Sequence, residues 1–200
     1  MSLSTAVYFT KKSDTHGMFS NFALCVVGYE FLVYDSVEAA FQAAKTLDST
    51  ERAKFCHVSP ATAKSMGRKL KLRPDWEQVK VGVMVSCLRS KFMVNEYYRK
   101  TLIDTGTALL LENTTGWNDN TWGRDFRCKN TLGRNFLGLC LMLVRSEFTK
   151  NPMVEFLTPS GERSFNIVTD FDELINGVSE KAMYLRQNYD WLYSEKKFVN

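Results

Sequence analysis

The chain has 200 residues, of which 44% are hydrophobic and 24% charged, and its formal net charge at pH 7 is +4. This is the composition of a globular protein with a core, and no apolar run approaches the roughly eighteen residues that span a bilayer. The N-terminus has no basic stretch followed by an apolar block, so no secretory signal is expected. Five cysteines without a C-x-x-C pair and only two histidines argue against a disulfide framework or a zinc site. We therefore expect a cytoplasmic protein without a membrane partner.

The N-terminal part of the chain predicts three short strands and a helix. Residues 6–10, 23–27 and 29–34 have the apolar and aromatic content of strands, and Gly28 is expected to separate the last two. Asp35 and Ser36 then offer an N-cap for a helix that reaches about Lys45.

Helices are predicted for most of the remaining chain. Pro60 favours the first position of a short helix that reaches Arg68. Further helices are expected at 74–92, at about 95–104 and at 132–148, whereas 107–112 fits either a strand or a helical turn.

Two stretches differ from this helical pattern. Residues 113–131 are rich in Gly, Asn and Thr and predict a long ordered loop, which is commonly functional. Beyond Phe148 the net charge turns negative, and 170–195 predicts one helix, broken near Gly177. The fold class expected is α+β, predominantly helical: a domain at 1–148 with a few short N-terminal strands, and an accessory helical C-terminal extension at 149–200 packed on it.

The helix that begins at Ser36 carries an unusual polar edge. At about 100° per residue, Glu38, Gln42 and Lys45 fall within roughly 60° of one another, beside an apolar stripe. A carboxylate, an amide and an amine aligned on a helix of small and apolar residues are typical of a site wall. A solvated face with one charge pair fits the pattern equally well.

Lys80 lies within the apolar stripe of the helix at 74–92. An inward-facing ammonium needs a carboxylate or an anionic ligand, because burying an unpaired charge is expensive. The alternative is a lysine that extends along the helix surface to water.

The long loop combines an acceptor with a flat ring. Asp119 precedes Trp122 by three residues, and Gly123 permits close approach to the backbone. This combination suits a ribose or a nucleobase, whose hydroxyls need acceptors and whose ring stacks. A tryptophan that closes the edge of a core is the alternative.

Small residues at the start of the next helix, Gly133, Asn135 and Gly138, allow backbone N–H groups to approach a phosphate or allow close helix packing. Two basic clusters suit a phosphorylated ligand or nucleic acid as well as a solvated surface. Their members are Lys64, Arg68, Lys69, Lys71 and Arg73, then Arg124, Arg127, Lys129 and Arg134.

Taken in order, these segments resemble the NADAR superfamily (NAD- and ADP-ribose-associated), the YbiA-like proteins. The blocks that carry the resemblance are 19–22, 36–45, 67–68, 73–76 with Lys80 and Met84, 91–92, 105–106, Glu112, 119–123, and 133–145. They cover about residues 6–148, and their shared order makes the resemblance specific.

The resemblance implies a metal-independent N-glycosidase without a cofactor, which cleaves the bond between ribose C1 and a base or amine nitrogen. Its expected substrates are a phosphoribosylamino-pyrimidine of riboflavin biosynthesis or an ADP-ribosylated guanine, and ADP-ribosylated nucleic acid is an expected partner in the second case. A non-catalytic module that binds ADP-ribose, or a nucleic-acid-binding protein, is the alternative function.

Chemistry then suggests provisional roles. Glu38 and Asp119 are the candidates for stabilising the sugar cation and for protonating the leaving nitrogen. Lys45 would form a Schiff base with the opened ribose or hold an anion. The remaining candidates bind substrate: Trp122 stacks on the base, Asn21, Gln42 and Asn135 meet sugar hydroxyls, Arg68 and Lys80 meet phosphate or the carboxylates, and Phe22 and Gly123 lie in matching motifs.

The chain departs from the family pattern at two places. Ala39 and Ala40 stand where many members have a histidine or an aromatic residue after the glutamate, which implies a roomier pocket. Trp122-Gly123 is followed by Arg124-Asp125 rather than by a second glycine.

Overall fold

The computed structural model describes residues 6–13, 15–127, 133–158 and 161–176. The chain divides into two compact units, Thr10–Asp104 and Met1–Phe9 with Thr105–Asn200. The N-terminal strand therefore belongs with the C-terminal half of the sequence. Each unit is described by itself.

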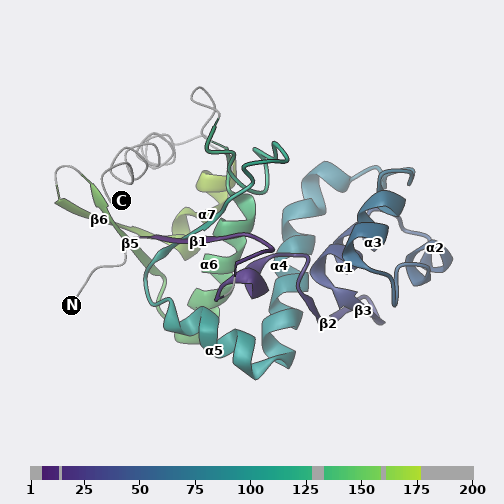
Figure 1. Ribbon diagram of the computed structural model, residues 1–200, viewed down its shortest axis with the longest axis horizontal. Helices are drawn as coiled ribbons and strands as arrows, with labels where there is room; N and C mark the ends of the chain where they lie inside the picture. Colours follow the sequence, from purple (N-terminus) through teal and green to yellow (C-terminus); the bar gives the residue numbers. More distant parts are fainter. Residues whose placement is uncertain (1–5, 14, 128–132, 159–160, 177–200) are drawn as a thin grey trace. The chain divides into compact units, whose positions relative to one another are not determined.

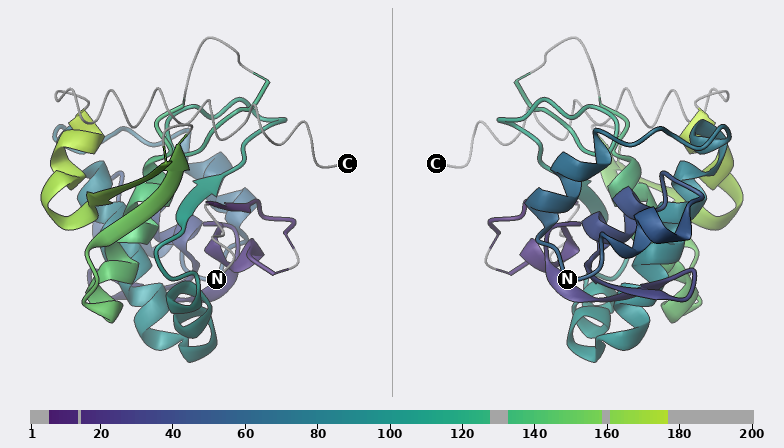
Figure 2. Two further views of the ribbon diagram at one scale, coloured as in Figure 1. Left: turned by 90° about the vertical axis from the view of Figure 1, so that its left-hand side faces the viewer. Right: turned by 90° about the vertical axis from the view of Figure 1, so that its right-hand side faces the viewer.

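The unit Thr10–Asp104 is built around one long helix. It contains a short 3-10 helix η1 (Gly17–Phe19), a hairpin of β2 (Leu24–Tyr29) and β3 (Leu32–Ser36), and five helices: α1 (Val37–Ala43), α2 (Ser49–Ala53), α3 (Pro60–Gly67), α4 (Trp76–Val94) and α5 (Glu96–Asp104). Helix α4 packs against β2, α1 and α5, while α1 also packs against α3 and β3 (Figure 2). Helix α1 is buried over its whole length.

Capping residues set the helix starts of this unit. The Ser36 hydroxyl accepts a hydrogen bond from Ala39 N, and the Ser59 hydroxyl accepts one from Thr62 N just before Pro60. The predicted starts of α1 and α3 are confirmed. Helix α1 ends at Ala43, so Lys45 lies just beyond the helix rather than on it.

The hairpin turn lies where the sequence does not place it. Gly28 is inside β2, where its N–H donates to Ser90 Oγ at 2.8 Å. The turn is made instead by Glu30 (φ 43°) and Phe31 (φ 65°), both left-handed without being glycine. The expectation that Gly28 separates the strands is wrong, because Gly28 lies inside β2 and is paired with Val33 of β3.

The other unit contains elements from both the N-terminal and the C-terminal part of the chain. Strand β1 (Ala6–Phe9) pairs in parallel with β4 (Leu109–Glu112), in a register that places Phe9 opposite Glu112. Helix α6 (Phe136–Thr149) packs against β4, and α7 (Ile167–Asn176) packs against α6 (Figure 1). The strand alternative for 107–112 is therefore the observed one.

The segment after α6 contains a hairpin that the sequence does not predict. Strands β5 (Met153–Thr158) and β6 (Gly161–Asn166) pair antiparallel, and Glu155 N donates to Thr107 O at 3.1 Å. The extension is thus a hairpin followed by α7, not helical throughout. The expected helix at 170–195 overlaps α7 as far as Asn176, and the rest of it lies outside the described residues. The domain boundary near 148 remains a prediction.

Helix α6 begins four residues later than predicted. Arg134 and Asn135, which precede the helix, are not helical. Arg134 N donates to Asn120 O of the 113–127 loop at 2.7 Å, and Asn135 has a left-handed backbone (φ 53°). None of the described helices is both long and apolar enough to cross a bilayer.

Candidate active site

Glu38 and Gln42 form a buried polar pair on α1. Their side chains are only 5% and 6% exposed, and Gln42 Nε2 donates to Glu38 Oε1 at 2.9 Å. This excludes the interpretation of the polar edge as a solvated face. Within the described residues Gln42 Oε1 is buried without a hydrogen-bond partner, so an acceptor remains for a ligand donor.

A glycine on α3 sets the position of Gln42. A Cβ placed on Gly67 would lie 1.9 Å from Gln42 Oε1 and 2.9 Å from Gln42 Cβ. Any larger residue at 67 must displace the amide. The close approach of α3 to α1 therefore depends on Gly67.

Lys45 lies beside this pair in a basic environment. Partial burial lowers the pKa of Lys45, the Glu38 carboxylate opposes that shift, and the positive charges of Lys64 and Arg68 add to it. The Lys45 Nζ is also 6.0 Å from the centre of the Trp76 ring. An amine whose pKa is lowered is more readily neutral, as a nucleophilic lysine must be.

A tight turn brings Asn21 and Phe22 to α1. Ala23 N donates to Ser20 O at 3.2 Å and closes the turn, while Glu38 N donates to Asn21 O at 3.0 Å. Among the described residues Asn21 Oδ1 has no hydrogen-bond partner although the residue is only 8% exposed. The backbone of the turn is thus tied to the start of α1, and its amide offers a second acceptor.

Basic side chains gather around Phe22. The Nζ atoms of Lys11 and Lys64 lie 5.1 Å and 5.5 Å from the centre of its ring. Arg68, at the C-cap of α3, is exposed. Lys64 and Arg68 therefore supply positive charge on the α3 side of Lys45.

Lys80 forms a salt bridge with Glu77 one turn earlier on α4, and its side chain is 21% exposed. Its expected contact with a substrate phosphate or a catalytic carboxylate stays a prediction. The fully buried lysine of this helix is Lys91, which is 0% exposed.

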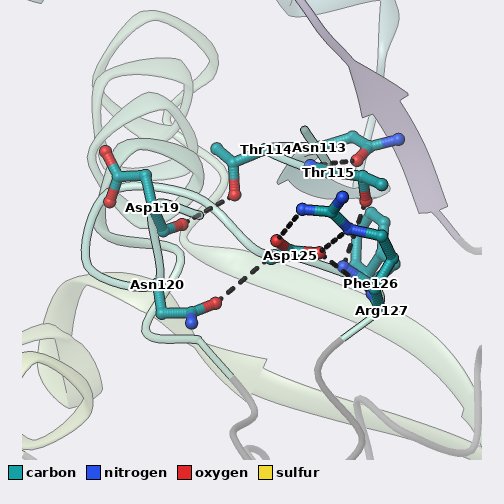
Figure 3. A network of polar contacts seen from close by, with 8 residues as sticks. All are labelled: Asn113, Thr114, Thr115, Asp119, Asn120, Asp125, Phe126 and Arg127. Carbon is teal, nitrogen blue, oxygen red and sulfur yellow. Dashed lines mark hydrogen bonds and ion pairs between the residues drawn. The ribbon is translucent and has the colours of Figure 1, made fainter. Parts of the chain in front are cut away.

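Asp119 organises the loop of the other unit (Figure 3). Its Oδ1 accepts hydrogen bonds from Thr121 N at 3.0 Å and Trp122 N at 2.9 Å, and its carbonyl accepts one from Thr114 Oγ1 at 2.6 Å. In Figure 3 its carboxylate points away from the ion pair of Asp125 and Arg127. One carboxylate oxygen of Asp119 thus has a structural role.

The Trp122 ring packs on the start of α6. It meets Phe136 edge to face, with ring centres 6.0 Å apart, and the residue remains partly exposed. Leu137 N donates to Trp122 O at 3.0 Å. The indole is therefore held by packing and backbone contacts while part of it stays accessible.

Two buried charged residues next to this loop were not assigned a role from the sequence. Glu112 and Arg124 are 9% and 2% exposed, and a Cβ on Gly123 would lie 3.0 Å from Glu112 Oε2. Gly123 is therefore required by close contact with Thr114 and Glu112. The available signal was a carboxylate at the end of an apolar strand, directly before the long loop that is expected to be functional.

Asn135 is occupied by the framework. Its Oδ1 accepts from Glu112 N at 3.1 Å, its Nδ2 donates to Leu110 O at 2.8 Å, and its side chain is 0% exposed. We correct its expected role as a ligand of a sugar hydroxyl: both ends of the amide bind strand β4. In the described ranges no group of three or more His, Cys, Asp or Glu side chains is placed to hold a metal ion.

Comparison with known proteins identifies the family. The model of the NADAR domain matches residues 8–149. N-glycosidase YbiA of Escherichia coli is 38% identical over 146 residues, which cover 72% of this chain and 88% of YbiA. An N-glycosidase of Nostoc punctiforme is 34% identical over 147 residues, covering 70% and 91%. A riboflavin biosynthesis protein of Vibrio vulnificus is 29% identical over 160 residues, 76% of this chain and 41% of that protein.

The fold supports the same grouping. The solved NMR structure of E. coli YbiA matches with a TM-score of 0.64 at 38% identity, covering 73% of this chain and 86% of that one. The predicted α+β class and the predicted family are both confirmed. The chain belongs to the NADAR domain family.

Proposed function

We propose that this chain is an N-glycosidase that hydrolyses the bond between ribose C1 and the nitrogen of a phosphoribosylamino-pyrimidine. The observation that carries the proposal is the buried pair of Glu38 and Gln42 with Lys45 beside it. The N-glycosidase names of two relatives support the reaction class, and the riboflavin name of a third supports the substrate.

The reaction places opposite demands on the two ends of the breaking bond. As the C1–N bond lengthens, positive charge develops on C1 and the ring oxygen while the nitrogen gains electron density. Water adds hydroxide to C1, and the nitrogen leaves with a proton. A buried carboxylate stabilises the sugar cation strongly because little solvent screens it.

Glu38 is the proposed carboxylate at the sugar. The bond from Gln42 Nε2 fixes one of its oxygens, and burial in α1 fixes its backbone. The free acceptors Asn21 Oδ1 and Gln42 Oε1 suit the donor hydroxyls of a ribose.

Lys45 has two compatible roles. A neutral amine can add to C1 of the opened sugar and displace the substrate nitrogen, which leaves with a proton, and water then hydrolyses the resulting Schiff base to free the lysine and the sugar. A protonated amine can instead hold an anion. The lowered pKa supports the first role, and the neighbouring Lys64 and Arg68 support the second. We propose that Lys64 and Arg68 bind the substrate phosphate, and that Lys11 extends this positive surface at Phe22.

Asp119 remains the proposed acid for the leaving nitrogen, and Trp122 with Gly123 the proposed surface for the base. Glu112 is a second candidate for the acid, because it is a buried carboxylate in contact with Gly123. The partial exposure of the Trp122 ring supports stacking on a base.

The test is an assay for both products. The protein is incubated with a phosphoribosylamino-pyrimidine and, separately, with DNA that carries ADP-ribosylated guanine, and the free base and sugar are measured. Release from the first substrate supports the proposal, and release from the second alone would shift the substrate to an ADP-ribosyl group. Absence of release from both, with folded protein, would contradict the proposed activity.

A module that binds ADP-ribose without cleaving it is the second candidate. The unpartnered acceptors and the basic side chains favour nucleotide binding whether or not a bond breaks. Calorimetry would then show binding while mass spectrometry recovers the ligand unchanged. We also propose a cytoplasmic location, on the basis of the cysteine pattern alone.

A further inference from the structure

Lys91 is a buried ammonium for which the proposed chemistry has no use. The residue lies in the last turns of α4 with 0% of its surface exposed. Its Nζ donates to the backbone carbonyl of Ser20, 71 positions away in the sequence, at 2.9 Å. Burying a lysine is costly, so a specific benefit is expected from it.

Within the described part of the chain, no carboxylate forms an ion pair with the Lys91 ammonium. The rings of Phe92 and Tyr98 lie 5.5 Å and 5.7 Å from Nζ, and the Cys25 thiol of β2 is the nearby titratable group. Burial lowers the pKa of Lys91 to about 8, so the amine still carries its proton at neutral pH. The carbonyl of Ser20 is thus its principal polar partner.

That carbonyl closes the turn on which two proposed substrate-binding residues stand. Ser20 O accepts both Lys91 Nζ and Ala23 N, and the two residues between Ser20 and Ala23 are Asn21 and Phe22. Asn21 O in turn accepts Glu38 N at 3.0 Å. One chain of contacts therefore leads from Lys91 through the turn to the backbone N–H of Glu38, the proposed catalytic residue.

We infer that Lys91 is a positioning residue that holds the Ser20–Ala23 turn, and so places Asn21 and Phe22 against the start of α1 for substrate binding. A charge-assisted bond to a backbone carbonyl is stronger and more directional than a neutral one. Without it the turn keeps the bond from Ala23 N to Ser20 O, the bond from Phe22 N to Ser20 Oγ at 3.2 Å and the contact with Glu38 N. The functional part of this inference rests on the proposed N-glycosidase activity.

Amide hydrogen exchange tests the anchor without any substrate. Exchange rates of Ala23 and Glu38 are compared by NMR in the full-length wild type and in Lys91→Met, whose side chain is one atom shorter and has no hydrogen-bond donor. Met84→Ala, at a buried position two turns earlier on α4, controls for lost core packing. We expect at least tenfold faster exchange at Ala23 and Glu38, relative to the other α1 amides, in Lys91→Met only. If Lys91→Met does not fold, Lys91→Leu, which also lacks a donor, is measured in the same way.

Turnover of the phosphoribosylamino-pyrimidine tests the functional part. We expect Lys91→Met to lose at least tenfold in kcat/KM at a temperature where it and Met84→Ala are both folded, while Met84→Ala stays within about threefold of the wild type. Unchanged exchange at Ala23 and Glu38 would overturn the anchor, and faster exchange with unchanged kcat/KM would overturn its role in positioning. If the wild type shows no turnover, the proposed function is contradicted. The structural role of Lys91 in the turn is not affected by that result, because the hydrogen-exchange comparison tests it separately.

Discussion

Gln42 Nε2 donates to Glu38 Oε1 at 2.9 Å, and more than nine-tenths of each residue is buried. The two residues are one helical turn apart on α1, whose other members are all small or apolar. The amide fixes the carboxylate and leaves its own oxygen toward Gly67.

Gly67→Ala should destabilise the protein, although glycine to alanine within a helix usually stabilises it. The added methyl would lie 1.9 Å from Gln42 Oε1, so the Gln42 amide must move. We expect a loss of about 1–3 kcal/mol in the free energy of unfolding, measured with urea. Gly82→Ala on α4 is the matched control, because its Cβ would meet no atom within 4 Å, and it should gain about 0.5–1 kcal/mol. If Gly67→Ala stabilised the protein as Gly82→Ala does, the close contact between Gly67 and Gln42 would be contradicted.

Asp119→Asn and Asp119→Ala should separate structure from chemistry. Asparagine keeps an oxygen for Thr121 N and Trp122 N, whereas alanine leaves both without it. We expect alanine to cost about 1–2 kcal/mol in stability and asparagine much less. If Asp119 is the acid, both variants lose at least about a hundredfold in kcat. Full activity in Asp119→Asn would transfer the acid role to Glu112.

Lys64→Met and Arg68→Met should weaken substrate binding without slowing the chemical step. Each removes one positive charge near Lys45, and a hydrogen bond to a charged group is worth about 1.5–3 kcal/mol. We expect about a tenfold rise in KM for each variant, with kcat within about twofold. Lys100→Met is the control, since its side chain is exposed and pairs with Asp104. Equal KM values for the three variants would argue against a phosphate contact on α3.

Stability should depend on pH through Lys91. Its pKa is about 8 in the folded protein against 10.5 for a free side chain. The folded state therefore loses this proton first as pH rises, and the cost of burying the charge disappears between about pH 8 and 10.5. Relative to Lys91→Met, the wild type should gain about 2 kcal/mol in unfolding free energy between pH 7 and 10.

The difference from Lys91→Met is needed because other groups titrate in the same range. Burial raises the pKa of Cys25, Cys87 and Tyr98, and each of these groups lowers stability as pH rises. Cys87 and Tyr98 are present in both proteins and cancel in the difference, whereas Cys25 interacts electrostatically with Lys91, so the difference reports Lys91 together with its effect on Cys25. A difference that stays constant from pH 7 to 10 would show that the lysine is not buried as a charge.

The local signals for α1 and α3 were sufficient to predict their starts, because a serine hydroxyl that caps a helix acts within four residues. The buried state of Gln42 could not be predicted, since Gly67 of α3, about twenty-five positions away, packs against its side chain. The predicted position of the β2–β3 turn, at Gly28, was wrong for a similar reason, because contacts between distant residues are not visible in a local pattern. Gly28 serves a contact with Ser90, which lies 62 positions further along the chain.

The two lysines of α4 show the limit of periodicity. Lys80 and Lys91 are eleven positions apart and so differ by only about 20° around the helix. The pattern therefore assigns them to the same face. Which of them is buried depends on the residues that cover the helix at each position along its axis. Ser20 and its turn lie over Lys91, whereas Lys80 pairs with the exposed Glu77.

Asn135 matched a family motif, but a motif does not distinguish a ligand contact from a framework contact. Its amide binds the backbone of β4 at both ends, and this pairing requires the strand to pass beside the start of α6. The β5–β6 hairpin was missed because its two six-residue strands show no clear alternation of polar and apolar residues.

The most direct measurement of the central claim is single-turnover cleavage of the phosphoribosylamino-pyrimidine by Glu38→Gln. Glutamine keeps an acceptor for Gln42 Nε2 but removes the negative charge, so substrate binding should survive while the rate of cleavage falls at least about a hundredfold. Glu51→Gln, at an exposed residue paired with Lys54, should cleave at the wild-type rate. Cleavage by Glu38→Gln within a few-fold of the wild-type rate would contradict the catalytic role of this carboxylate.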